Sequence, residues 1–270
     1  MRNNRDNNEL ADFFNEKAEQ YNNVSFIKDD PISIPHRFSL KQDIEISGLF
    51  ASILAWGNRK SIINSSNRLL ALMDNHPYQF IMDLKLQSPK TMIDLSSFVH
   101  RTFNGTDLLY LIDFLHYHYA IKGETSLETA FTKGLNPADN DTENSLNGFR
   151  KYVFSKDICE EIPQRTKKHI AAPYKKSACK RLNMYLRWMV RADDKGVDFG
   201  LWKKIKPSQL VCPIDVHVAR VAKRFHILDR KQTDWQAAIE ITNYLKQLDA
   251  NDPVKYDYAL FGLGVIEKFC

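Results

Sequence analysis

Apolar residues along the chain recur every three or four positions, which is the spacing of one buried face of an α-helix. The clearest runs cover residues 46–54, 108–119, 182–189, 218–225, 235–245 and 256–263. Short alternating strands bounded by turns do not occur, and there are only 10 Gly and 10 Pro. The pattern predicts an all-α protein of roughly nine or ten helices and disfavours barrels, sandwiches and glycine-rich nucleotide folds.

Local signals mark where several of these helices begin. Ser39–Gln42 and Thr233–Gln236 have the form of a capping box, with Ser39 and Thr233 as the N-caps. Asp252–Pro253 has the form of an N-cap followed by proline at the first helical position. The polar stretch Thr132–Ser145 is the clearest long loop.

Composition limits the class of protein. The chain has 270 residues and is 43% apolar, enough to form a core, which excludes global disorder. The four cysteines form no CxxC pair, so neither a zinc knuckle nor a disulfide framework is indicated. The N-terminal stretch has no apolar signal core, and no apolar run approaches the roughly 20 residues that span a bilayer. We expect a reduced, cytoplasmic protein with no membrane association.

Positive charge is concentrated in one segment. The formal net charge is +5, yet Pro163–Arg191 holds nine Lys and Arg and no Asp or Glu, which leaves −4 for the rest of the chain. One basic segment on an otherwise acidic protein is typical of nucleic-acid binding, because phosphates neutralised by Lys and Arg release condensed counterions. The alternative is a solvated basic face with no partner.

Part of this segment has helical periodicity from Ser177 onward. We expect this helix to bury an apolar face and to present a basic face, with residues at i, i+4, i+7 and i+11, to solvent. The expected outward residues are Lys180, Met184, Arg187 and Arg191.

Several familiar sites are absent from the sequence. There is no GxxxxGK phosphate loop, HExxH, GxSxG elbow or glycine-rich dinucleotide turn. His116 and His118 are two positions apart, so on a helix their rings point in different directions and do not share a metal. We therefore expect no metal and no cofactor.

Two residues remain as candidates for chemistry. Asp215 follows Pro213-Ile214 where a helix N-cap is expected, which would hold its carboxylate ionised and oriented. Lys180 stands among other basic residues, where it is either a phosphate contact or an amine nucleophile. Each taken alone also fits an ordinary structural role.

Four strings in order resemble the helix-hairpin-helix DNA glycosylase superfamily. Pro213–Arg220, PIDVHVAR, is similar to its V-D-T-H-V-x-R helix entry, and Ser177–Met184 occupies the place of its hairpin and lysine, G-x-G-x-K. Phe50–Arg59 looks like its early helix and DNA-wedging loop, and Tyr256–Gly264 is similar to its penultimate helix. The whole chain is similar to a bacterial family placed beside this superfamily, and more distantly to archaeal 8-oxoguanine DNA glycosylases.

The resemblance implies a two-lobed helical fold over residues 1–270 that grips DNA. Residues 41–180 would form a central lobe, and residues 1–40 with 190–270 the second lobe. The iron–sulfur branch of the superfamily has a four-cysteine pattern that this chain lacks, so no cluster is expected. We expect a monomer whose partner is double-stranded DNA with a base lesion.

The resemblance also assigns roles to residues. Lys180 would be the Schiff-base lysine and Asp215 the catalytic aspartate, while Asn58 or Arg59 would fill the gap left by an extruded nucleotide. Together with Asn58 and Arg59, the expected DNA contacts are Lys167, Lys168, Lys175, Lys176, Arg181 and Arg187. The aromatic residues expected to stack on the extruded base are Trp202, Tyr258 and Phe261.

The sequence departs from the family pattern at two points. KKSACK stands where G-x-G-x-K is expected, so lysine side chains would replace the close backbone approach to phosphate that glycine allows. Lys180 and Asp215 are also farther apart than is usual, so the insert must fold to bring them together. Without the glycines the alignment leaves Lys175, Lys176 and Lys180 all open as the amine.

Three functions compete on these observations. The first is a DNA glycosylase of base-excision repair that removes a damaged base, such as an oxidised purine, with AP lyase activity through a lysine. If the lysine is not positioned, Asp215 would direct water instead and the enzyme would be monofunctional. The second is a non-catalytic DNA-binding protein on the same fold, and the third is a helical interaction protein that ignores nucleic acid.

Overall fold

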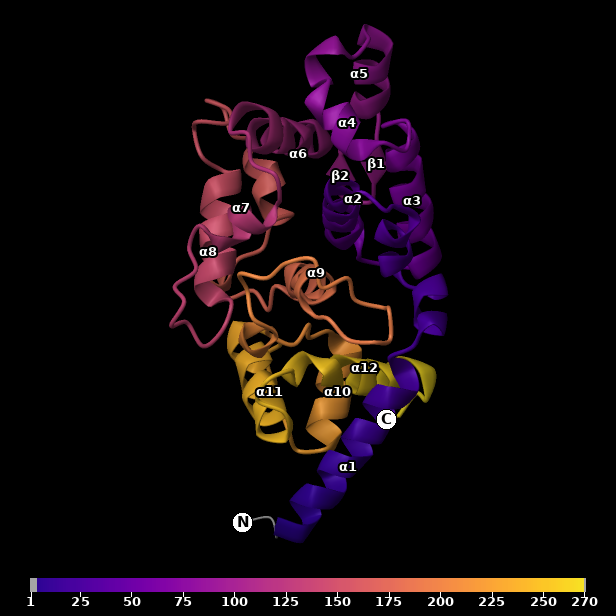
Figure 1. Cartoon of the computed structure of the whole chain (residues 1–270), viewed down its shortest axis with the longest axis vertical. Coiled ribbons are helices and arrows are strands. Elements are labelled where there is room, and N and C mark those ends of the chain that lie inside the picture. The colour runs from indigo at the N-terminus through magenta and orange to yellow at the C-terminus, as the bar shows by residue number, and fades with distance from the viewer. Residues whose placement is uncertain (1–3, 270) are drawn as a thin grey trace. The chain divides into compact units, whose positions relative to one another are not determined.

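The computed structural model describes residues 4–269, which belong to two compact units (Figure 1). The unit that we call the central unit consists of Asp29–Pro137 and Glu143–Ala171. The unit that we call the terminal unit consists of Met1–Lys28, Ala138–Thr142 and Ala172–Cys270. As predicted, the structure is mostly helical.

The bounds of the units differ in part from those of the predicted lobes. The predicted central lobe, residues 41–180, overlaps most of the central unit, to which the structure adds residues 29–40. Residues 138–142 and 172–180 belong instead to the terminal unit. Lys180 and Asp215 therefore lie in the same unit.

The central unit is built around α2 (Lys41–Leu54), in which every residue from 44 to 54 is buried. Its other α-helices are α3 (Arg59–Ala71), α4 (Pro77–Met82), α5 (Pro89–Ser96), α6 (Gly105–His116), α7 (Glu128–Thr132) and α8 (Glu143–Val153). Its 3₁₀ helices are Pro31–Ser33, Pro35–Arg37, Leu84–Leu86 and Gln164–Lys168. α2 packs against both α3 and α4.

The start of α2 differs from the prediction. Its N-cap is Leu40, and no side chain caps the helix, so the capping box proposed at Ser39 is wrong. A Ser39 cap would require the helix to begin one residue earlier than it does. The apolar face predicted for this helix is confirmed, since Ile46, Leu49 and Phe50 are all buried.

A short hairpin precedes α6, although the sequence showed no strand. β1 (Val99–His100) and β2 (Phe103–Asn104) pair antiparallel, and Arg101 between them has a φ of +55°. Asn104 then caps α6: its side chain accepts from the Asp107 amide at 3.4 Å, and Asp107 accepts from the Asn104 amide at 3.0 Å. The hairpin is so short that alternation of apolar residues could not reveal it.

The terminal unit contains the candidate catalytic residues. Its α-helices are α1 (Asn4–Tyr21), α9 (Lys180–Val190), α10 (Val216–Arg224), α11 (Trp235–Leu248) and α12 (Asp257–Phe261). Its 3₁₀ helices are Val24–Asp29, which ends at the boundary, Pro173–Lys175, Pro207–Gln209 and Pro253–Tyr256. A one-turn π-helix, Gly262–Ile266, follows α12, and another, Tyr117–Ile121, follows α6 in the central unit. α12 packs against α1 and α10, so the last helices form one core with the first.

The start of α11 also differs from the prediction by one residue. The N-cap is Asp234 instead of Thr233, and the Asp234 carboxylate accepts from the Ala237 amide at 3.0 Å. Asp252 lies at the N-cap position before Pro253 as predicted, but makes no side-chain capping bond there. Its carboxylate instead binds the Arg191 guanidinium at 2.9 Å.

Two further expectations concern membranes and thiols. Among the described residues, no helix has both the length and the apolar character needed to cross a membrane. Cys159, Cys179 and Cys212 are free thiols, and Cys270 lies outside the described residues.

Candidate active site

Lys180 is the first residue of α9, and an irregular segment places it there. The 3₁₀ helix Pro173–Lys175 ends at Lys176, whose φ of +58° is in the left-handed region. The N-cap of α9 is Cys179, also left-handed, whose amide donates to the Ser177 hydroxyl at 3.2 Å. Lys176 stands where the resemblance expects the first hairpin glycine, and its backbone has a conformation that glycine favours.

Asp215 is the N-cap of α10, as predicted. Its Oδ1 accepts hydrogen bonds from the amides of His217 and Val218, each at 2.9 Å. These bonds fix the orientation of the carboxylate, and the positive end of the helix dipole favours its charge. Oδ2 is left to face a different partner.

That partner is Lys180, whose Nζ lies 3.3 Å from Asp215 Oδ2. The Lys180 side chain is 34% exposed and the Asp215 side chain 18% exposed, so solvent reaches the pair. The insert between them folds back along α9: the Phe199 amide donates to the Trp188 carbonyl at 2.8 Å, and the Trp202 amide donates to the Met189 carbonyl at 2.9 Å. The structure therefore brings together the two residues predicted to be catalytic.

A buried ion pair lies close enough to influence this site. Arg187 Nη1 donates to Asp257 Oδ2, and both side chains are almost inaccessible. The pKa of Asp257 is raised to about 6, chiefly by burial. Among the neighbouring charges, Arg187 and Lys180 lower this pKa and Asp215 raises it. Burial also raises the pKa of the Cys212 thiol, which Asp257 raises further, so Cys212 is no competing nucleophile.

The titration of Asp257 gives a pH-dependent contribution to stability. Folding raises its pKa from 3.8 to about 6, so between these values the folded state keeps a proton that the unfolded chain has released. The contribution is therefore complete below pH 3.8 and is lost as the pH rises to about 6. Relative to Asp257→Asn, we expect the wild-type free energy of unfolding to fall by roughly 3 kcal/mol over this interval and then to stay level. Urea unfolding across the interval measures this difference, and a difference that does not change with pH contradicts the expectation.

The basic face predicted for α9 is wrong. Met184, Arg187 and Arg191 are all buried, because loop and helix segments cover α9 on this side as well. Arg187 binds Asp198 and Asp257, and Arg191 binds carboxylates of the same cluster. The prediction that Arg187 contacts DNA is therefore corrected: its guanidinium is used inside the protein.

Two of the three predicted stacking residues are in the core. Trp202 is 1% exposed and meets the Tyr185 ring edge-on at 5.4 Å, while Tyr258 is fully buried with the Arg187 guanidinium 4.4 Å from its ring centre. The stacking role is therefore wrong for both in this structure. Phe261 is half-buried, with its ring 5.8 Å from that of Phe26.

One exposed aromatic residue was missed by the sequence analysis. Tyr174 is 58% exposed, and Lys175 Nζ lies 5.3 Å from its ring centre. The available signal was its position, an aromatic ring inside a basic stretch and outside any helical apolar face. Aromatic rings exposed among cations are the kind that stack on unpaired bases.

The remaining predicted DNA contacts are divided between the units. Lys168, Lys175 and Lys176 are exposed, whereas Lys167 and Arg181 are half-buried. Lys167 and Lys168 belong to the central unit, and the other three to the terminal unit.

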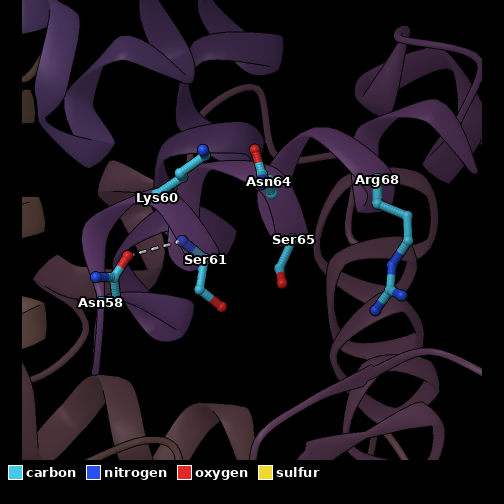
Figure 2. Close-up of a pocket in the computed structure, with 6 residues that line it drawn as sticks. All are labelled: Asn58, Lys60, Ser61, Asn64, Ser65 and Arg68. Atoms are coloured by element: carbon cyan, nitrogen blue, oxygen red, sulfur yellow. Dashed lines mark hydrogen bonds between the residues drawn. The ribbon is translucent and has the colours of Figure 1, made fainter.

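Asn58 and Arg59 also belong to the central unit, at the start of α3. Asn58 is the N-cap of the helix, and its side-chain oxygen accepts from the Ser61 amide at 3.4 Å (Figure 2). Arg59 is the first helical residue and is half-buried. The Asn58 side chain thus has a structural task in addition to the wedging role expected from the resemblance.

Within the part of the chain that the structure describes, no three His, Cys, Asp or Glu side chains gather as a metal site requires. His116 Nδ1 bonds to the Ile81 carbonyl oxygen at 2.8 Å, and His118 is buried between Tyr152 and Ser126. Each ring is therefore committed to a separate structural contact.

The chain belongs to the family described as Protein of unknown function (DUF2400), whose model matches residues 30–266. The match includes Lys180, Asp215 and the whole of α3. No curated protein matches the chain, and no solved structure matches it. The description of the family names no activity.

Proposed function

We propose that this family member is a DNA glycosylase of base-excision repair that removes a damaged base and then cuts the strand through a Lys180 Schiff base. The 3.3 Å contact between Lys180 Nζ and Asp215 Oδ2 carries the proposal. An amine held against a carboxylate, with both groups reachable from solvent, is the arrangement that nucleophilic substitution at a sugar carbon requires. It joins two residues that the resemblance to helix-hairpin-helix glycosylases had paired.

The proposed reaction begins with proton transfer. The duplex first extrudes its damaged nucleotide, at a cost of a few kcal/mol. Asp215 takes a proton from the Lys180 ammonium, and the resulting amine attacks C1′ of the deoxyribose. The bond between C1′ and the base breaks, the base leaves with the bonding electrons, and Asp215 passes its proton to the departing base. The Asp215 carboxylate that is restored by this transfer then stabilises the positive charge that develops on the sugar.

The second half of the reaction cuts the strand. The sugar ring opens, and a Schiff base forms between C1′ and the Lys180 nitrogen. Loss of a C2′ proton then expels the 3′ phosphate, which is β-elimination. Hydrolysis of the remaining imine returns the free lysine, so no external oxidant or reductant is needed.

Residues near Lys180 supply contacts to DNA in this proposal. Lys175 and Lys176 are exposed in the segment just before α9, where they would bind phosphates. Tyr174 in the same segment takes the stacking role proposed earlier for Trp202 and Tyr258. All three residues lie in the same unit as the Lys180–Asp215 pair.

Borohydride trapping tests the proposal, since it reduces a Schiff base to a stable protein–DNA bond. Duplexes carrying 8-oxoguanine, uracil or an abasic site are incubated with the protein and then reduced. We expect a lesion-dependent covalent adduct that disappears in Lys180→Gln. It should persist in Lys175→Gln and Lys176→Gln, which remove neighbouring exposed amines.

Other outcomes point to other functions. An adduct that survives Lys180→Gln shows that another amine reacts. Base release without an adduct, seen as alkali-labile strands, indicates a monofunctional enzyme in which Asp215 directs water. Duplex binding with neither adduct nor base release overturns the proposal and favours the alternative, a non-catalytic DNA-binding protein on this fold.

A further inference from the structure

The central unit has an open pocket of about 410 Å³ on α3, far from Lys180 in the sequence. It is lined by Asn58, Lys60, Ser61, Asn64, Ser65 and Arg68 (Figure 2). Figure 2 shows Ser61, Ser65 and Arg68 pointing to one side of the helix, and Lys60 and Asn64 to another. The two sets are two adjacent ridges of the helix, because residues three or four positions apart share a face.

The lining of this pocket is positive and rich in hydrogen-bond donors. No Asp or Glu occurs between Glu45 and Asp74, while Lys60 and Arg68 both reach the pocket. Among the described residues, neither cation forms an ion pair with a carboxylate. The other polar groups are the hydroxyls of Ser61 and Ser65 and the amides of Asn58 and Asn64. Two cations beside several hydrogen-bond donors suit an anionic ligand.

Two of the lining side chains are held in place by the hairpin before α6. Arg68 Nη2 donates to the Val99 carbonyl at 2.5 Å, and its guanidinium carbon lies 4.8 Å from the centre of the Phe98 ring. Ser65 Oγ lies 2.8 Å from His100 Nδ1. An arginine fixed in this way retains further N–H groups for a ligand and loses less entropy when it binds one.

We infer that the α3 pocket binds phosphate groups of the DNA backbone. Lys, Arg, Ser and Asn are among the side chains that contact phosphate oxygens in protein–DNA complexes. The pocket is open to solvent, so a phosphate on an extended strand can reach its lining. This inference rests on the proposed function in so far as the strand is DNA, and it adds a second DNA contact, on the central unit.

Salt-dependent binding of an undamaged, fluorescein-labelled duplex tests the inference. In Lys60→Gln/Arg68→Gln we expect affinity to fall at least about tenfold at about 50 mM salt, because two phosphate contacts are lost. The slope of log K against log salt should also shrink by up to about 2, since each contact contributes about 0.9. The matched control, Lys90→Gln/Lys151→Gln, removes two exposed cations from the same unit and should leave the slope unchanged.

A second arm distinguishes DNA from a free phosphate compound. Inorganic phosphate at constant ionic strength should not stabilise the wild-type protein against heat. If it does so, and the Lys60→Gln/Arg68→Gln substitutions abolish the effect without changing the DNA slope, the pocket binds small phosphates and the inference is wrong. An unchanged slope in an otherwise active protein overturns the inference but leaves the glycosylase proposal standing. If the substitutions Lys60→Gln/Arg68→Gln reduce the slope but the wild-type protein releases no base, the inference is supported and the glycosylase proposal is overturned.

Discussion

Replacing Asp215 by Asn is expected to lower the rate of base release by about 10²–10⁴-fold while leaving DNA affinity nearly unchanged. The loss follows from chemistry, because an amide can neither take the proton of the Lys180 ammonium nor stabilise positive charge on the sugar. The fold should be preserved, since asparagine is as good an N-cap as aspartate and can still accept from the amides of His217 and Val218. Single-turnover base release with saturating enzyme measures the chemical step apart from binding.

The chain offers a matched control in α11. Asp234 is likewise an N-cap, accepts a backbone amide and pairs with a basic side chain, Arg230 at 2.7 Å. Asp234→Asn therefore removes a carboxylate from the same structural role without touching the Lys180 site, and base release should be unaffected. If Asp215→Asn releases base as fast as Asp234→Asn does, the Lys180–Asp215 pair is a structural ion pair and the catalytic role is wrong.

The candidate pair could be predicted because both members sit in local patterns. Asp215 follows Pro213-Ile214 at the start of a helix with one apolar face, and the resemblance pairs that motif with a lysine, which here is the first residue of α9. Sequence alone could not show that the long insert would allow contact. The contact depends on hydrogen bonds that hold Phe199 and Trp202 of the insert against α9. No short-range sequence pattern predicts such bonds.

The burial of Arg187 could not be predicted, for a different reason. Helical periodicity assigns a charged residue to the solvent side, which is right when no buried carboxylates face it. The carboxylates that pair with Arg187 are Asp198 and Asp257, 11 and 70 positions away, in segments whose paths a single sequence does not reveal. The same lack of long-range information explains Trp202, which lies in the insert and has no periodic neighbours to mark its inward side.

Arg187→Met is expected to lower the free energy of unfolding by about 3–5 kcal/mol, which is what breaking a buried ion pair by removing one partner costs. Arg187 serves two buried carboxylates, Asp198 and Asp257. Arg191 still pairs with Asp198 at 3.1 Å, so Asp257 is left as the uncompensated charge. Urea unfolding at neutral pH measures the loss. The control Arg224→Met makes the same change at an exposed position and should stay within about 0.5 kcal/mol of the wild type.

The pH dependence of that loss identifies its cause. Burial already raises the pKa of Asp257 to about 6, and removing Arg187 takes away the charge that most lowers it. In the variant the carboxyl group therefore stays protonated to a higher pH, and once protonated it no longer leaves a bare charge in the core. The deficit of Arg187→Met should consequently be larger at pH 8 than at pH 5. A deficit of equal size at both values would mean that lost side-chain packing, and not the buried charge of Asp257, destabilises the variant.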